Sequence, residues 1–397
     1  MVNIIELPNE LSLKILSYFE YDKATLCQLA LVSSHFRPLA KEALLKHLVL
    51  SANLLEDEHN SSFDRILQIL VEEPNIATLV RTLTLSWTHQ ENYPRAEYLL
   101  QRLPLLESLY LSVPFFASSE DGKPHRPSFR FLQKHPFNRL TKLQLASDIT
   151  WLDLTEFMYL PKLEHLNLHH LPPCDAVPLP EKFQGRISPV RSIDLQHCRS
   201  ALDRSLERLL QRAGKLEVLQ LRCGVHYWPL RFGQSLAPAH HTLRSLTITG
   251  RGMYIGMDDS RLDLSGFQML QKVDVFSFLF FSSFRANKAR DGLYRLLPQS
   301  LLELRIEFPP NTGLIESTPQ TVTHVFKGWE LDWVMEIALN KATHFPGFSS
   351  LSLLERLHVG AQQCEEFILP EPLKLAFEVS SIAFQGWCRE GWWRACN

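Results

Sequence analysis

Four stretches in the middle of the chain repeat one apolar pattern: residues 190–195 read VRSIDL, 216–221 LEVLQL, 243–248 LRSLTI and 270–275 LQKVDV. Each has aliphatic residues at its first, fourth and sixth positions, and the starts at 190, 216, 243 and 270 lie 26, 27 and 27 residues apart. Such regular spacing predicts internal repeats, and a repeat determines the fold of the whole chain. We call this six-residue pattern the strand motif.

The strand motif occurs twelve times, and most of its copies lie 23 to 35 residues apart. One step of 53 residues, from 301 to 354, is close to twice 26, so we expect either a degenerate copy or a helix near Val322 and Val325. The first positions of the twelve copies are Leu45, Val80, Leu106, Leu140, Leu163, Val190, Leu216, Leu243, Leu270, Leu301, Leu354 and Val379.

The motif predicts short strands separated by varied connections. Side chains alternate across an extended strand, so the fourth and sixth motif residues face a core, and the third, fifth and seventh face solvent. Apolar residues at helical spacing predict a helix within 200–212, and Gly214 follows where a helix stop is expected. Prolines between 172 and 189 and a Gly/Pro-containing stretch at 118–128 predict loops, whereas 329–342 predicts an inserted helix.

This periodicity resembles that of leucine-rich repeats. The resemblance implies an α/β fold for residues 45–397, an irregular solenoid of about twelve units with parallel strands on a concave side and helices and loops on a convex side. The family also carries Asn or Cys three residues after the last aliphatic position. Only Asn53 and Cys198 fit this rule here, so we expect an uneven solenoid.

Residues 5–46 do not follow the repeat and predict three helices. Leu11, Ile15, Leu16 and Phe19 form an apolar stripe of helical spacing. A break at 20–23 precedes a second apolar segment that ends at Val32, and Pro38 suits the first turn of a third helix. About 42 residues are close to the lower limit for independent stability, so this unit is expected to lean on a partner or on the repeats.

This segment resembles an F-box. The residues that carry the resemblance are Leu7, Pro8, Glu10, Leu11, Ile15, Leu16, Phe19, Leu26, Leu29, Ala30, Val32, Ser33, Phe36, Leu39 and Ala40. The resemblance implies that residues 1–46 form an F-box helical module that docks on a Skp-family adaptor and, through it, on a cullin. An alternative is a helical cap that closes the first repeat. We expect the adaptor interface to include Leu7, Pro8, Leu11, Ile15, Leu16 and Phe19.

The solvent-facing motif positions are the candidates for binding a protein substrate. They are mostly polar while their neighbours are aliphatic, and in leucine-rich repeats they line the concave face. Central copies combine His, Asp and Arg at the most regular spacing. The candidates are His165, Asn167, His169, Asp194, Gln196, Gln220, Arg222, Lys272, Asp274 and Arg305, with Ser192, Val218, Phe276, Glu303 and Glu307 at equivalent positions.

No motif for catalysis or for a cofactor stands out. The cluster of His165, His169, His170 and Cys174 has zinc-ligand residue types, but strand alternation separates the histidines, so we expect a solvated strand and no metal. Residues 233–237 lack the second glycine of a nucleophile elbow, and no phosphate-binding loop occurs. We therefore expect neither enzyme activity nor a cofactor.

Composition favours an ordinary intracellular protein. The net charge is −2 with no marked basic run, which argues against nucleic acid as a partner. Seven scattered cysteines without a CxxC pair favour a reducing compartment, and the longest apolar stretch, 275–284, is too short to span a membrane. We expect a cytoplasmic or nuclear protein that contacts neither membrane nor nucleic acid. The Trp-rich residues 387–397 suggest either a cover for the open end of the last repeat or a truncated or mis-spliced end.

Together these patterns predict the substrate-recognition subunit of an SCF-type ubiquitin ligase. The F-box would bind the adaptor, and the repeats would bind a protein substrate and raise its concentration near the conjugating enzyme. The alternative is a non-catalytic leucine-rich-repeat scaffold that acts outside any ubiquitin ligase.

Overall fold

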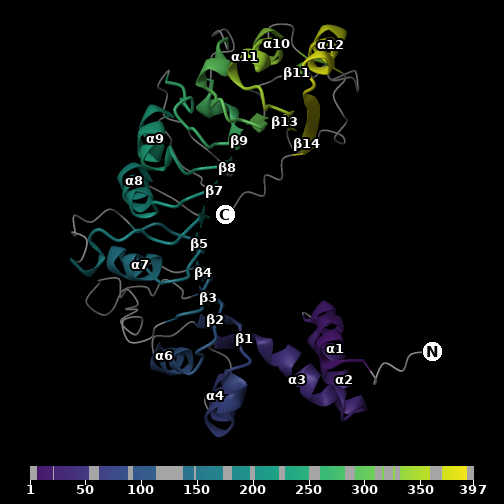
Figure 1. Cartoon of the computed structure of the whole chain (residues 1–397), viewed down its shortest axis with the longest axis vertical. Coiled ribbons are helices and arrows are strands. Elements are labelled where there is room, and N and C mark those ends of the chain that lie inside the picture. The colour runs from purple at the N-terminus through teal and green to yellow at the C-terminus, as the bar shows by residue number, and fades with distance from the viewer. Residues whose placement is uncertain are drawn as a thin grey trace. The chain divides into compact units, whose positions relative to one another are not determined.

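A computed structural model of the chain shows a mixed α/β architecture with helices at the N-terminus and parallel strands after them (Figure 1). The chain divides into two compact units: unit 1 is Met1–Pro172 with Val177–Pro189, and unit 2 is Pro173–Ala176 with Val190–Asn397. The residues that the structure describes are 7–20, 22–52, 62–87, 93–112, 137–146, 149–172, 181–196, 202–222, 229–249, 260–281, 291–308, 315–316, 325–326, 331–357 and 369–390.

Unit 1 begins with the three helices that the sequence predicts. They are α1 (Asn9–Leu16), α2 (Lys23–Val32) and α3 (Phe36–Lys46), with a 3-10 turn, η2 (Ser17–Phe19), after α1. Pro38 lies in the first turn of α3, where a missing N–H costs no helical hydrogen bond. We call residues 7–46 the helical module.

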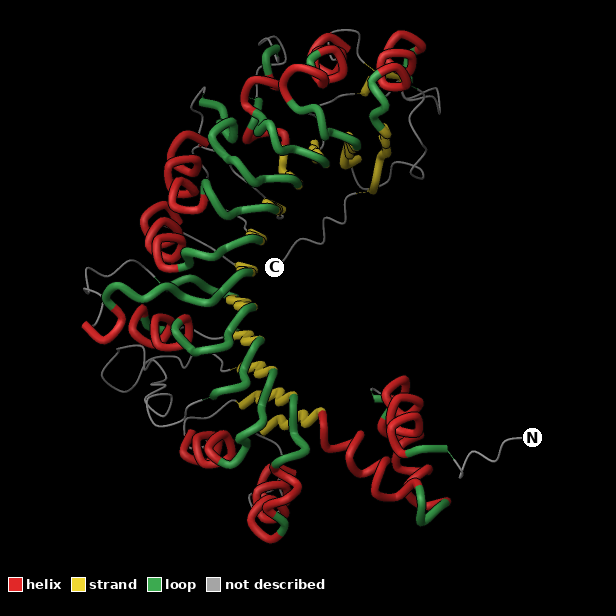
Figure 2. Tube along the Cα trace, viewed as in Figure 1, coloured by secondary structure: helices red, strands yellow, loops and turns green. Residues whose placement is uncertain are grey.

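Among the described residues of unit 1, five parallel strands follow the helical module in chain order. They are β1 (His47–Ala52), β2 (Thr82–Trp87), β3 (Ser108–Ser112), β4 (Lys142–Leu145) and β5 (His165–Leu168). The connections contain α4 (Ser62–Glu72), α5 (Pro74–Ala77), α6 (Tyr93–Gln101), α7 (Trp151–Met158) and η5 (Glu181–Phe183). Helices therefore lie between β1 and β2, between β2 and β3, and between β4 and β5 (Figure 2).

The described residues of unit 2 form seven parallel strands in chain order and one short hairpin. The parallel strands are β6 (Ser192–Leu195), β7 (Val218–Arg222), β8 (Ser245–Thr249), β9 (Lys272–Phe276), β10 (Glu303–Phe308), β13 (Ser350–Leu357) and β14 (Ala383–Glu390). The antiparallel hairpin pairs β11 (Ile315–Glu316) with β12 (Val325–Phe326). The helices are α8 (Leu202–Arg212), α9 (Pro229–Leu236), α10 (Leu331–Leu339), α11 (Lys341–His344) and α12 (Glu371–Val379), with 3-10 turns η6 (Ala237–Ala239), η7 (Ser277–Leu279) and η8 (Leu293–Leu296).

The strand motif sets which side chains are buried. In β8 the fourth and sixth residues, Leu246 and Ile248, are buried, while the third, fifth and seventh, Ser245, Thr247 and Thr249, are half-exposed. The same alternation recurs in β3 through β7. We call the side that bears the third, fifth and seventh motif residues the outward face. Helices α8 and α9 lie on the other side of their strands (Figure 1).

Strand pairing confirms the predicted motif register for the first ten copies. Within unit 1, Leu48 aligns with Leu83 and Leu109 aligns with Leu143. Within unit 2, Leu219 aligns with Leu246. Each of these residues is the fourth of its motif, so the same motif position stacks from repeat to repeat.

The last two predicted motifs are wrong in register. Leu304 aligns with Leu351, so the eleventh copy starts at Phe348 and not at Leu354. Leu351 in turn aligns with Phe384, which places the last strand two residues later than predicted. Val379, which the sequence placed in the core, is the end of α12 and is 78% exposed. The apolar run at 348–359 supports two motif alignments, and only pairing with β10 selects between them.

Among the described residues, the wide step after the tenth copy adds no strand to the parallel sheet, because β10 pairs directly with β13. Val322 lies outside the described residues. Helix α10 lies where the sequence predicts a helix, and Asn340 ends it by donating from Nδ2 to the carbonyl oxygen of Glu336 at 2.8 Å. Trp333 of α10 is fully buried against Phe281 and Phe308, with ring centroids 5.1 and 6.3 Å away. Val325 lies in the hairpin strand β12, so it is not part of the parallel sheet.

Other predicted connections are confirmed where the structure describes them. Helix α8 occupies most of the helix predicted at 200–212. Between β5 and β6 the described residues contain the 3-10 turn η5 and no α-helix, as the prolines predict. The loop predicted at 118–128, Asn53, Cys198 and the chain after residue 390 lie outside the described residues.

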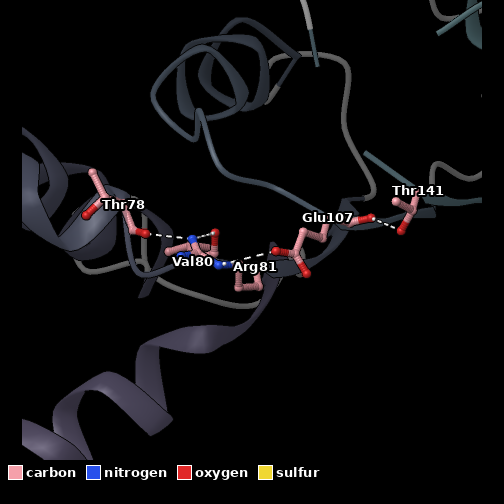
Figure 3. Close-up of polar contacts among 5 residues, drawn as sticks. All are labelled: Thr78, Val80, Arg81, Glu107 and Thr141. Atoms are coloured by element: carbon pink, nitrogen blue, oxygen red, sulfur yellow. Dashed lines mark hydrogen bonds and ion pairs between the residues drawn. The ribbon is translucent and has the colours of Figure 1, made fainter. Parts of the chain in front are cut away.

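A ladder of main-chain hydrogen bonds joins the repeats where each strand begins. In unit 1 the carbonyl oxygen of Arg81 accepts from the amides of Glu107 at 2.8 Å and Ser108 at 3.0 Å, and the carbonyl oxygen of Glu107 accepts from Thr141 and Lys142. Figure 3 shows the side chains at this edge: Arg81 lies 3.4 Å from the Glu107 carboxylate, and the Thr141 hydroxyl donates to the Glu107 carbonyl oxygen. One carbonyl therefore fixes two residues of the next repeat.

A matched pair of valine substitutions tests the corrected register. Val275 is fully buried at a sixth motif position, whereas Val379 is exposed. We expect Val275→Ala to lower the free energy of unfolding by about 2 kcal/mol, because it removes two buried carbons and leaves a cavity. Val379→Ala should change it by less than about 0.5 kcal/mol. Urea unfolding of both variants measures this, and similar losses would contradict the register.

Candidate functional site

The helical module has a small core of its own. Leu16, Leu26, Leu39 and Ala43 are buried together, and four half-buried apolar residues pack around them. Asp22 caps the N-terminus of α2, and its carboxylate accepts from the Thr25 amide at 3.1 Å and the Thr25 hydroxyl at 2.7 Å. These hydrogen bonds hold the pKa of the Asp22 carboxyl below its usual value. The module is therefore ordered by local caps and by a few buried leucines.

An apolar face of this module remains exposed to solvent. Leu11, Ile15 and Tyr18 follow one another at four- and three-residue steps along α1 and η2, and Phe19 lies beside them. Leu11 is 49% exposed, although leucines in helices usually face a core. A contiguous exposed apolar face on a small module marks a site where another protein binds.

Six residues were predicted to form this interface, and the structure places one of them elsewhere. Leu7 is half-buried, Pro8 is exposed, and Leu11, Ile15 and Phe19 are exposed. Leu16 is 2% exposed and lies in the module core, so its predicted role as a contact residue is corrected to a structural one. A stripe of helical spacing contains both the core-facing and the solvent-facing edges, and the sequence does not separate them.

Three exposed apolar residues of the module were missed as site residues. Tyr18 is 81% exposed, and Leu31 and Val32 at the end of α2 are each 80% exposed. Val32 belongs to the F-box resemblance, so a signal for it was present in the sequence. Leu31 and Tyr18 carried no such signal, because their exposure depends on how α2 and η2 pack against α3.

The module is joined to the first repeats without a loop, since α3 ends at Lys46 and β1 begins at His47. Glu20 Oε2 lies 3.1 Å from His47 Nε2, and Lys41 Nζ lies 2.8 Å from Glu73 Oε2. A small cleft of about 160 Å³ lies beside this junction, lined by Leu13, Ser17, Glu42, Lys46, Leu79 and Arg81 among others. The Glu20–His47 contact, the Lys41–Glu73 ion pair and one continuous main chain thus link the module to the first repeats of unit 1.

On the outward face of unit 2, most of the predicted charged residues form ion pairs across strands. Arg222 Nη2 lies 3.4 Å from Asp194 Oδ2, Lys272 Nζ lies 2.7 Å from Glu303 Oε1, and Arg305 Nη1 lies 3.7 Å from Asp274 Oδ2. The sequence placed these residues on one face but did not pair them. Gln196 and Gln220 are half-exposed on the same face.

Two outward positions in unit 2 differ from expectation. Phe276 and Glu307 are each 3% exposed, so the prediction that they face solvent is wrong. They lie beside each other in the pairing of β9 with β10, and Glu307 also aligns with Leu354, which is buried as well. The outward positions at this end of β9, β10 and β13 are therefore buried.

The predicted residues of unit 1 keep their expected side of β5. His165 is exposed, and Asn167 and His169 are half-exposed. Among the described residues there is no group of three or more His, Cys, Asp or Glu side chains that could hold a metal ion, and Cys174 lies outside those residues. The described part of the chain also contains no helix long and apolar enough to cross a bilayer.

The carboxyl of Asp274 lies on the outward face, and its environment disfavours its charged form. Its burial raises the pKa of the Asp274 carboxyl above the usual value, Arg305 opposes this shift, and Glu307 adds to it. The ion pair at 3.7 Å is therefore too long to compensate for the lost hydration.

This shift predicts a pH dependence of stability. A carboxyl whose pKa is raised in the folded state binds its proton more tightly there than in the unfolded state, so its penalty is present at neutral pH and disappears as pH falls through the raised pKa. We expect Asp274→Asn to be more stable, relative to the wild type, at pH 7 than at pH 4. Urea unfolding at both values measures this difference, and an advantage that grows toward pH 4 would contradict it.

Comparison with known proteins identifies the helical module. Residues 4–51 match an F-box-like family model, which covers the three helices and most of β1. A search of the curated proteins found no match. The family match confirms the F-box resemblance of the N-terminal residues, while the leucine-rich-repeat assignment of the rest of the chain stays a prediction. The N-terminus of this chain carries an F-box-like domain, which supports its assignment as an F-box protein.

Proposed function

We propose that this protein is the substrate-recognition subunit of an SCF-type ubiquitin ligase. In this proposal the helical module binds a Skp-family adaptor, which connects it to a cullin, and the repeats bind a protein substrate. The observation that carries the proposal is the exposed apolar face of Leu11, Ile15, Tyr18 and Phe19 on a module that matches the F-box-like family. F-box domains generally bind adaptors of this family.

The rest of the chain supports a role in binding and not in bond chemistry. The outward faces carry hydroxyl, amide and paired charged groups on rigid strands, which suits recognition of another protein. The chain would act by holding a substrate near a conjugating enzyme, so catalysis lies with other subunits. We place this activity in the cytoplasm or nucleus, where the ubiquitin machinery acts.

The direct connection of α3 to β1 supports a positioning role. Because the helix runs into the strand and two side-chain contacts bridge the junction, the first repeats would follow the orientation of the bound module. A substrate receptor of this kind would present its cargo in a fixed direction.

Charge substitutions on the apolar face test adaptor binding. We expect the double variant Leu11→Glu with Ile15→Glu to bind a purified Skp-family adaptor more than a hundredfold more weakly. Two apolar contacts would be lost and two carboxylates would be desolvated, together about 3 kcal/mol or more. Replacing Leu7 and Pro8 together by Ala should also abolish capture. Isothermal titration calorimetry on the full chain measures the affinity.

The matched control is Leu230→Glu on α9, because Leu230 is an equally apolar and similarly exposed residue outside the module. It should bind the adaptor like the wild type, and circular dichroism should show all variants folded. Unchanged adaptor affinity in the Leu11 and Ile15 variant would contradict the proposed interface. Failure of the wild type to bind any Skp-family adaptor would instead favour a scaffold that acts outside a ligase.

A further inference from the structure

Strand β8 carries an uncharged, hydroxyl-lined strip on the outward face of unit 2. Its outward residues are Ser245, Thr247 and Thr249, all half-exposed. Beside them on β7 lies the half-exposed amide of Gln220, which aligns with Thr247. Hydroxyl and amide groups both donate and accept hydrogen bonds, so this strip can satisfy the main chain of an extended peptide.

A cation lies on each side of this strip, at opposite ends of β8. Arg222 on β7 aligns with Thr249, and Lys272 on β9 aligns with Ser245. Their side chains are 55% and 56% exposed. From a strand spacing of about 4.8 Å and a rise of about 3.3 Å per residue, the two positions lie about 16 Å apart along a diagonal.

The carboxylates that pair with these cations lie on the far strands. Asp194, the partner of Arg222, is on β6, and Glu303, the partner of Lys272, is on β10. Asp194 is only 18% exposed, so it holds the Arg222 guanidinium from below while the guanidinium faces solvent. Glu303 is 50% exposed, so Lys272 and its carboxylate partner both face solvent. Each side of the strip on β8 thus carries an exposed cation whose carboxylate partner lies one strand farther from β8.

The carboxyl of Asp274 also lies near the strip on β8. Asp274 lies beside Thr247 in the pairing of β8 with β9, but it is largely recessed, and Arg305 on β10 pairs with it. Asp274 therefore adds little exposed negative charge next to β8.

We propose that the outward face of β7, β8 and β9 binds an extended acidic peptide segment. One carboxylate of the segment pairs with Arg222 and a second pairs with Lys272, while the polar main chain between them lies over the hydroxyls of β8. An extended chain covers about 3.4 Å per residue, so the two acidic residues are about five positions apart. That this segment belongs to a ubiquitination substrate rests on the proposed function above.

The paired charges favour carboxylates over phosphates. A guanidinium has five N–H donors, so Arg222 can bind a carboxylate while it keeps its contact with Asp194. A phosphate group carries nearly two negative charges at neutral pH and would meet Asp194 or Glu303 close by. Each cation here is already neutralised once, so a singly charged ligand group balances the site better.

Synthetic peptides test the proposal on the full chain. The probe is a fluorescein-labelled ten-residue peptide of Ser, Thr and Gly with two glutamates five positions apart, measured by fluorescence anisotropy at low salt. We expect saturable binding that weakens at least fivefold when the glutamates are adjacent, and more when they are replaced by glutamine. Arg222→Gln and Lys272→Gln should each weaken binding about tenfold, as expected for one lost charge-assisted hydrogen bond.

The matched control is Arg191→Gln. Arg191 is also 55% exposed and also pairs with a carboxylate, Glu217 at 3.3 Å, but it lies at the strand entrance and not on the outward face. This variant should bind the peptide within twofold of the wild type. Adaptor capture by all three variants should equal that of the wild type, which separates this test from the test of the proposed function.

Three results would overturn the proposal. The first is no saturable binding of the two-glutamate peptide, and the second is equal weakening by Arg191→Gln and by Arg222→Gln. The third is tighter binding of a peptide with phosphoserine in place of both glutamates, which would assign the face to a phosphorylated ligand.

Discussion

The double acceptance of hydrogen bonds at each strand entrance is the constraint on which both units depend. In unit 2 the carbonyl oxygen of Arg191 accepts from the amides of Glu217 and Val218, and Glu217, Arg244, Gln271 and Leu302 repeat this arrangement toward the C-terminus. A shift of one residue would break both bonds and turn every buried leucine of the strand to the outward face. These hydrogen bonds thus fix both the register of each strand and the side chains that it buries. As a result, each outward side chain has defined neighbours on the adjacent strands.

These defined neighbours determine which charged side chains pair on the outward face. The Lys272–Glu303 and Asp274–Arg305 pairs form because these residues align directly in the pairing of β9 with β10. Charges that are scattered along the sequence thus become neutral pairs across neighbouring strands. The helical module differs, because its exposed residues are apolar and lie on α1, on η2 and at the end of α2.

Sequence reasoning succeeds where one alignment of the motif is much better than its neighbours. Around Leu219 and Leu246 only one register places aliphatic residues inward. The spacing therefore predicts both the strand and the side of the sheet on which each residue lies. Around 348–359 the chain is apolar in two registers six residues apart, and the choice depends on the amides of Ser349 and Ser350 donating to the Leu302 carbonyl oxygen, a contact between distant segments.

The candidate site, too, is predicted only in part by the sequence. The apolar character of α1 is visible in the sequence, but whether Leu16 or Leu11 faces solvent depends on the position of α2 and α3. The exposure of Leu31 and Tyr18, the burial of Glu307 and the cross-strand ion pairs likewise depend on tertiary packing. Residue type and spacing predict which surface is used, and packing determines which side chains are accessible on it.

The central claim is that the helical module, and not the repeats, is the surface by which the chain joins a larger assembly. Amide hydrogen exchange of the full chain, with and without a purified Skp-family adaptor, tests this claim most directly. The account predicts that the adaptor slows exchange in α1 and at the end of α2 and leaves β6 through β10 unchanged. Unchanged exchange throughout the module, or protection confined to the repeats, would contradict it.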